Sequence, residues 1–352
     1  MMLILAREAR CLTQMELVAK SGIAQATLSR YEHDIIAPTP EHLECLVKIL
    51  DFPASFFEQS NGDVVSGLVF HRKKAALAVK SQRLLIAESK LRLAGIKKLS
   101  KEIDYTLDIP PVDFERIGED PNSMARLVRQ YWKVPRGPIK NIVALVESKG
   151  ISILRFDFGS SLLDGFTFND DFYCIVINSR MPMDRQRFTI AHELGHLLMH
   201  EYFYDEAEDQ ANRFAAEFLM PADDIEDDLR YGAKFSLAKL AALKEVWRVS
   251  MGALLFRAKA LDIIPASTHL WLTKEMSSRG YRRSEPYPLT DEKPVLLNKI
   301  VQVCRDSLAY TNEELMKIMH LNQTDYNRFF IQKPANEFDS NRSFFKKEIA
   351  EG

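Results

Sequence analysis

One segment of the chain joins an apolar helical pattern to side chains that bind metals: TIAHELGHLLMH, from Thr189 to His200. His192 and His196 are four residues apart, so on a helix they lie on the same face, one turn apart. Two imidazoles in this relation can converge on one ion at zinc–nitrogen distances of about 2.1 Å. Glu193 lies about 100° round the helix, where it can reach a water activated by the metal. The spacing therefore predicts a metal centre with His192 and His196 as ligands and Glu193 as general base.

Two other residues of this segment need an explanation. The rise from His192 to His200 is about 12 Å along a helix, too far for one ion to bind both. We therefore assign His200 a supporting or structural role outside the ligand set. Gly195 costs about 1 kcal/mol relative to alanine in mid-helix. We interpret it as room for a substrate strand or a neighbouring backbone.

The acid-rich segment that follows, DEAEDQANRFAAEFLMP, can supply the third ligand that a catalytic zinc requires. Glu208 shares a helical stripe with apolar positions and with Asn212, so it points inward and can reach the metal. Asn212 can accept a hydrogen bond from a ligand histidine. A second stripe is expected to face solvent, and it contains Glu206, Gln210, Arg213 and Glu217.

The alternative is that His192 and His196 are only hydrogen-bonded residues of the core. That alternative leaves Glu193 and Glu208 without explanation, so a zinc site is favoured, and Mn²⁺ is a second metal that fits.

The same residues carry a family resemblance. The stretches RQRFTIAHELGHLLMH and EDQANRFAAEFLMP resemble the ImmA/IrrE family of zinc peptidases, as do the upstream DGF and the strand end IVIN. The similarity runs from the helix before Gly150 to Pro221. It implies that His192, His196 and Glu208 bind zinc in a gluzincin-like arrangement and that Glu193 is the catalytic base. It also implies cleavage of helix-turn-helix repressors, which derepresses stress or mobile-element genes.

Residues 1–60 have the pattern of a small helical unit. Thr13 and Glu16 form a capping box that opens a short helix, and Gly22 ends it. A second helix, QATLSRYE, follows after a short turn, which is the helix-turn-helix pattern. Its outward residues are Gln25, Thr27, Ser29 and Arg30.

The stretch LTQMELVAKSGIAQATLSRYEHD, followed by P-x-P, resembles the XRE-type (Cro/cI-like) helix-turn-helix family. The resemblance implies that the QATLSR helix enters the major groove of DNA. There glutamine can read adenine, and arginine can read guanine or hold phosphate. A domain that only binds protein or dimerises is the alternative, because residues 1–60 hold more acidic than basic side chains.

The remaining pattern predicts the fold class. ISILRF and YCIVIN are strand-like runs, joined by a polar loop with Gly159 and Gly165 and flanked by helical segments. We expect a mainly α protein with a small β-sheet in the peptidase domain (α+β) and an N-terminal all-α helix-turn-helix domain. The expected domains are residues 1–60, a basic helical linker region at 61–135, the peptidase core at 136–231 and a C-terminal helical region at 232–352. The C-terminal region either recognises substrate or simply packs on the core.

Charge is unevenly distributed along the chain. Between Ser66 and Lys101 ten basic residues face one acid, Glu88, whereas the segment from Glu201 to Arg230 holds eleven acids and two arginines. The basic segment predicts either an anionic partner, such as DNA phosphate, or a solvated helix face.

The composition is that of a soluble globular protein, with 46% hydrophobic and 27% charged residues and a net charge of −2. No segment approaches the ~20 apolar residues of a membrane span, and the N-terminus lacks the features of a signal peptide. Four widely spaced cysteines predict reduced thiols in a cytoplasmic protein.

The sequence thus predicts a cytoplasmic zinc endopeptidase with a DNA-binding domain, which cleaves a transcriptional repressor or itself. Its expected partners are DNA, a repressor protein and a second copy of the chain, with no membrane. The alternative is a DNA-binding regulator of a toxin–antitoxin or prophage module, in which the peptidase fold acts as a sensor or partner-binding module.

Overall fold

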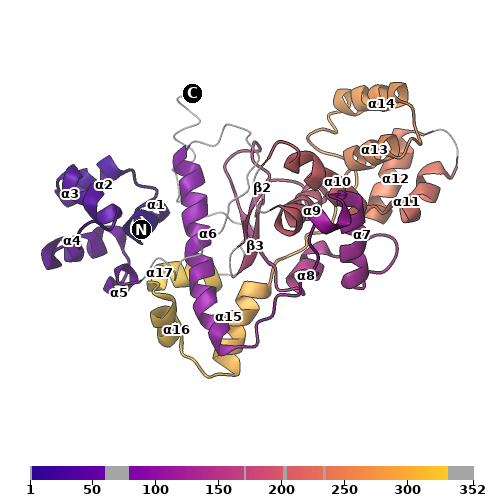
Figure 1. Cartoon of the computed structure of the whole chain (residues 1–352). Coiled ribbons are helices and arrows are strands. Elements are labelled where there is room, and N and C mark those ends of the chain that lie inside the picture. The colour runs from indigo at the N-terminus through magenta and orange to yellow at the C-terminus, as the bar shows by residue number, and fades with distance from the viewer. Residues whose placement is uncertain (1, 60–78, 170–171, 201–203, 233–234, 332–352) are drawn as a thin grey trace.

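A computed structural model of the chain describes residues 2–59, 79–169, 172–200, 204–232 and 235–331 (Figure 1). Within these ranges the protein is mainly helical with one small sheet of three strands, which confirms the predicted fold class. The helix-turn-helix domain lies at one end of the molecule, the sheet lies near the centre, and α11–α14 lie at the other end.

The N-terminal domain contains five helices. Their bounds are α1 Met2–Ala9, α2 Gln14–Ser21, α3 Gln25–Glu32, α4 Pro40–Leu50 and α5 Ala54–Phe57. The capping box at Thr13 and Glu16 is formed, and Gly22 ends α2 in the left-handed conformation with φ of 71°. The domain begins one helix earlier than the sequence pattern indicated. Helix α1 was missed because it has only eight residues, and the sequence does not reveal that it packs on α3 and α6.

Helix α6 (Val79–Leu99) carries the described part of the basic segment except Lys101, which follows it; residues 66–78 of that segment lie outside the described residues. Lys80 binds Glu16 of the helix-turn-helix domain at 2.9 Å, and Arg83 lies 3.7 Å from Glu8. Burial lowers the pKa of Arg92 to about 10. These three basic side chains therefore contact groups of the protein itself, although the side chains of Lys80 and Arg83 remain 36% and 58% exposed.

The sheet is mixed and has the order β1–β3–β2. Strand β1 (Ser152–Phe156) runs parallel to β3 (Tyr173–Asn178), and β2 (Gly165–Asn169) runs antiparallel to β3. The prediction of a loop around Gly165 was wrong at this point, because Gly165 and Asn169 are the two ends of β2. This strand has only five residues, and it begins with glycine and ends with asparagine, which are typical of turns. Its sequence is therefore too short and too turn-like to be predicted as a strand.

The two faces of the sheet belong to different hydrophobic cores, because successive strand side chains point to opposite faces. Leu154, Phe166 and Val176 face a core shared with α6 and the helix-turn-helix domain. Ile153 and Ile175 face a second core that contains the helices of the peptidase part. Those helices are α7 Pro121–Tyr131, α8 Ile142–Glu147, α9 Met183–Met199, α10 Ala207–Leu219 and α11 Ala222–Arg230; short 3₁₀ turns lie at Ser100–Glu102 (η2) and Glu115–Ile117 (η3).

The predicted C-terminal region is divided between these two cores. Helices α12 (Leu237–Trp247), α13 (Met251–Ala260) and α14 (Ala266–Ser278) join the second core. The later elements join the first core, beside α6 and the helix-turn-helix domain; they are α15 Leu296–Asp306, α16 Asn312–Met319, α17 Gln323–Tyr326 and η4 Asn327–Ile331.

Two further observations concern earlier expectations. The four cysteines are free thiols. No helix in the described ranges is both long and apolar enough to cross a bilayer.

A chain of ion pairs joins the N-terminal domain, α6 and the C-terminal elements. Asp325, which is only 2% exposed, accepts from Arg10, directly after α1, at 2.7 Å and from Arg328 at 2.9 Å. Arg328 in turn binds Glu88 of α6 at 2.7 Å. One buried carboxylate therefore holds two guanidinium groups that come from distant parts of the sequence.

We expect Asp325→Asn to destabilise the full chain by about 2 kcal/mol, because both arginines lose a charged acceptor in a partly buried site. The measurement is urea denaturation followed by circular dichroism. Asp306→Asn, at an exposed position of α15, is the control and should change stability by less than about 0.5 kcal/mol. Equal stability of the two variants would show that the ion-pair chain does not hold the domains together.

Candidate metal centre

Helix α9 places the histidine motif between the sheet and α10. His192, Glu193 and His196 are 8%, 5% and 1% exposed, so these polar groups lie in the interior. The helix packs on β2 and β3 and, on another side, on α10 (Figure 1). Because buried polar groups are costly without partners, the contacts of these side chains decide what the site can do.

Gly195 allows α10 to approach α9 closely. A β-carbon at this position would lie 3.0 Å from Cδ1 of Phe214 and 3.2 Å from its Cγ. The interpretation of Gly195 as room for a substrate strand or a backbone was therefore wrong, because the neighbour is the Phe214 ring of α10. The glycine sets the distance between the helix that carries the histidines and the helix that carries Glu208.

Donor atoms of three side chains converge between these helices. The Nε2 atoms of His192 and His196 are 3.1 Å apart. Glu208 Oε2 lies 3.7 Å from Nε2 of His192, and Oε1 lies 3.5 Å from Nε2 of His196. Two atoms bound tetrahedrally at about 2.1 Å from one zinc ion are about 3.4 Å apart. The spacing of the three side chains thus fits one small divalent cation.

The hydrogen bonds behind the two rings fix their protonation. Burial lowers the pKa of His200 to about 4, so its ring is neutral at neutral pH. Its Nε2–H donates to Gln210 Oε1 at 2.9 Å, and its Nδ1 must then accept from Nδ1–H of His196 at 2.9 Å. Nδ1 of His192 donates to Oδ1 of Asn212 at 3.0 Å.

Both rings therefore direct the lone pairs of Nε2 toward the same space as the Glu208 carboxylate. Two neutral lone pairs 3.1 Å apart repel each other, and a cation between them removes the repulsion. His192, His196 and Glu208 thus form a set of residues that could hold a metal, and Asn212 and His200 each lie within hydrogen-bond distance of one of the two histidine rings.

Strand β2 lies directly against the general-base candidate. A β-carbon at Gly165 would lie 3.4 Å from Cγ of Glu193, 2.8 Å from Cγ2 of Thr189 and 2.8 Å from the carbonyl oxygen of Val176. Asn178 holds the loop before this strand, because its Nδ2 donates to the carbonyls of Ser160 and Leu163. The absence of a side chain at Gly165 thus lets β2 approach the helix at Glu193.

The predicted solvent stripe of α10 is partly wrong. Gln210 faces the site, where its Oε1 accepts from His200 and from the hydroxyl of Tyr204 at 2.6 Å. Glu217 is buried and binds Arg257 of α13 and, at 3.1 Å, Arg126 of α7. The stripe was misread because α7 and α13 cover this side of α10. Nothing in the local pattern reveals partners 91 and 40 residues away.

The DNA-contact candidates lie on α3, at the outer end of the molecule (Figure 1). Gln25 and Arg30 are exposed, whereas Thr27 and Ser29 are half-buried. Gln25 is held by a hydrogen bond of 3.0 Å from its Nε2 to Gln14 at the start of α2. Among the described residues, the main contacts of α3 are with α1 and α2, and Gln25 and Arg30 on its outer face remain exposed.

The helix-on-sheet frame with a His–His–Glu donor set is the arrangement of a metallopeptidase centre. Residues 146–259 match the peptidase family described as the IrrE N-terminal-like domain, and residues 3–57 match a helix-turn-helix family. Over 117 residues the chain is 31% identical to metallopeptidase ImmA of Bacillus subtilis (strain 168), a match that covers 29% of this chain and 67% of that protein. The chain therefore belongs to the ImmA/IrrE family of metallopeptidases and carries an N-terminal helix-turn-helix domain.

We expect Asn212→Ala to weaken zinc binding by about 10- to 100-fold, because the His192 ring loses the acceptor that fixes its tautomer and orientation. Competition with a chromophoric chelator measures the affinity of the full chain. Asp209→Ala, an exposed change on the same helix, is the control and should leave the affinity within about twofold. An unchanged affinity in the Asn212 variant would remove the supporting role assigned to this residue.

Proposed function

We propose that the protein is a zinc-dependent endopeptidase, with Mn²⁺ as a second usable metal, whose helix-turn-helix domain binds DNA. The observation that supports this most directly is the convergence of His192 Nε2, His196 Nε2 and the Glu208 carboxylate. Two imidazoles and one carboxylate are the ligand set that a catalytic zinc uses when a further position is left for substrate.

A metal held by these residues would act as a Lewis acid on the scissile carbonyl and lower the pKa of a water molecule. The protein supplies the rest. Asn212 and His200 keep both rings in the tautomer that directs Nε2 toward the metal. The buried surroundings of His192 and His196 exclude bulk water, which strengthens the electrostatic interactions in the site.

Glu193 is the general base and then the general acid in this proposal. Its carboxylate takes a proton from the attacking water and delivers it to the nitrogen of the leaving amine, so one residue serves both half-steps. The close packing of α9 on β2 at Gly165 supports this role, because it places Glu193 beside the edge strand of the sheet.

Strand β2 is the edge of the sheet beside Glu193, and no described strand pairs with its outer side. The backbone N–H and C=O groups of an edge strand can bind an extended peptide as an additional strand. We therefore propose that the substrate chain is cleaved in an extended segment alongside β2.

The helix-turn-helix domain points to the substrate class. Binding to DNA would bring the peptidase domain close to transcription factors that are bound to the same DNA. We therefore propose a cytoplasmic enzyme that cleaves a transcriptional repressor or its own chain. The alternative is a DNA-binding regulator in which the peptidase fold serves only as a sensor or partner-binding module. The supporting observation for that alternative is the accessible outer face of α3.

We expect Glu193→Gln to abolish proteolysis while zinc remains bound, because the variant keeps all three ligands and loses only the base. The measurement compares new protein N-termini by mass spectrometry in host cells that express the wild type or the variant. A small set of cuts made only by the wild type would identify the substrate.

The control is the zinc content of both purified proteins, which should be equal. Identical N-termini in the two strains, under conditions that induce the substrate pathway, would contradict the peptidase proposal. Self-cleavage is tested separately, since it predicts that purified wild type loses its full length in the presence of zinc and that the variant does not.

We expect Arg30→Ala to weaken operator binding by about tenfold or more, because the exposed guanidinium of α3 is the best placed group to bind guanine or phosphate. Genomic SELEX with the full chain, followed by gel-shift titration at fixed salt, measures the effect. Lys48→Ala, on the exposed side of α4, is the control. Loss of DNA binding without any proteolysis by the wild type would favour the regulator.

A further inference from the structure

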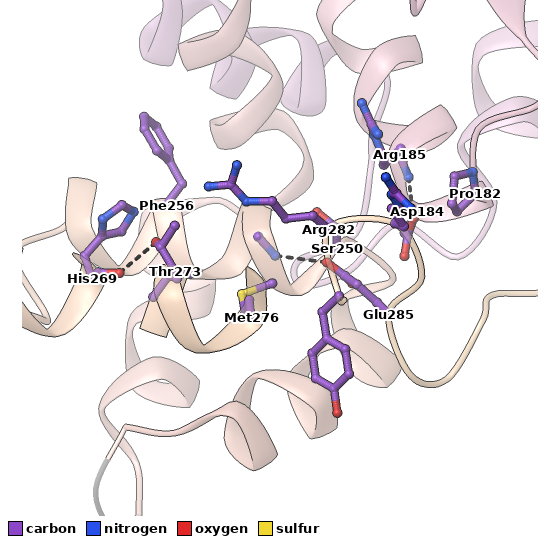
Figure 2. Close-up of a pocket in the computed structure, with 14 residues that line it drawn as sticks. Pro182, Asp184, Arg185, Ser250, Phe256, His269, Thr273, Met276, Arg282 and Glu285 are labelled. Carbon is purple, nitrogen blue, oxygen red and sulfur yellow. Dashed lines mark hydrogen bonds between the residues drawn. The ribbon is translucent and has the colours of Figure 1, made fainter. Parts of the chain in front are cut away.

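A cavity of about 340 Å³ lies between the start of α9 and the helices α13 and α14 (Figure 2). It lies at the N-terminal end of the helix whose later turns carry the histidines, and it contains none of the metal-centre residues. Its size is at the lower end of pockets that bind small molecules. Neither the proposed metal centre nor the helix-turn-helix domain accounts for this cavity.

One part of the cavity wall is basic. Arg185 of α9 and Arg282 and Arg283, which follow α14, line it together with His269 of α14. Figure 2 shows Arg282 reaching from its loop toward Phe256 and His269, with Arg185 on the other side of the pocket. Among the described residues neither Arg282 nor Arg283 has a carboxylate partner, and Arg185 lies 3.5 Å from Asp164.

The two acidic residues of the wall cancel only part of this charge, because they share one buried ammonium group. Asp184 and Glu285 bind the buried ammonium group of Lys244, with 2.9 Å between Lys244 Nζ and Glu285. Glu285 also accepts from the backbone N–H groups of Met251 and Gly252. The first amides of α13 are thus occupied, and the positive charge available to a ligand comes from the arginine side chains.

The other part of the wall is apolar and includes aromatic rings. It is formed by Leu255, Phe256, Met276 and Tyr281. Phe256 is 57% exposed although it belongs to a helix that otherwise buries its large apolar side chains. An exposed ring at the rim of a pocket is available to stack on a flat group. The ligand that fits both parts has an anionic head and an aromatic ring.

We propose that this pocket binds a small phosphate monoester with an aromatic ring, the chemistry of a mononucleotide. The phosphate binds to the exposed guanidinium groups of Arg282 and Arg283, because guanidinium groups bind phosphate through paired N–H donors. The ring lies against Phe256 and Tyr281. Binding at this pocket does not depend on the proposed peptidase activity.

The test is isothermal titration of the full chain with AMP, GMP and UMP, and with adenosine and inorganic phosphate as the two halves of the ligand. We expect at least one nucleotide to bind about tenfold or more tightly than either half, because both parts of the wall contribute. Arg282→Glu should weaken nucleotide binding by about tenfold or more. Phe256→Ala should weaken nucleotide binding and leave phosphate binding unchanged.

Lys274→Glu is the matched control, since it reverses a charge at an exposed position of α14 outside the pocket. Thermal melting of each variant verifies folding, which surface changes at Arg282 and Phe256 should preserve. Three results would overturn the proposal: no binding of any nucleotide, binding no tighter than that of inorganic phosphate, or binding that neither variant alters.

Discussion

The metal centre depends on the contact between Gly195 of α9 and the ring of Phe214 on α10. Two of the donor groups come from α9 and the third from α10, so the distance between these helices sets the distance between the donors. A close-packed interior transmits small shifts, and a side chain at position 195 would displace α10 together with Glu208. The ion pairs of Glu217 with Arg126 and Arg257 hold α10 from its other side. The ligand geometry is therefore a product of helix packing that the motif itself does not contain.

The same logic extends outward to the groups that orient the donors. His200 ends α9, and its ring can bridge from His196 to Gln210 only because α10 brings that amide alongside. The burial that makes an unpaired imidazole costly also keeps His200 neutral, which leaves one donor and one acceptor on the ring. A single neutral histidine thus determines which nitrogen of His196 is free for a metal.

The sequence was most informative where spacing along one helix carries the chemistry. The HExxH spacing, the inward stripe of Glu208 and Asn212 and the capping box at Thr13 depend on residues within one or two turns, and the structure places them as that spacing requires. Expectations that depended on distant partners were less accurate. Gln210 and Glu217 were assigned to solvent because their partners lie on other helices, and β2 was missed because five residues between turn-formers give no periodic signal. Gly195 could be recognised from the sequence as a costly residue in mid-helix, but its neighbour was inferred wrongly, because the Phe214 ring is brought beside it only by the fold.

The helix-turn-helix domain shares a hydrophobic core with one face of the sheet, and α6 supplies much of the contact. This matters for DNA binding because residues 1–60 contain five basic and eight acidic side chains. Lys80 and Arg83 of α6 lie beside Glu16 and Glu8, so docking of α6 offsets part of the negative charge that DNA phosphate would meet. A domain separated from α6 would keep its acids and lose these cations. Helix α6 therefore contributes to the electrostatics of the DNA-binding domain as well as to the core that this domain shares with the sheet.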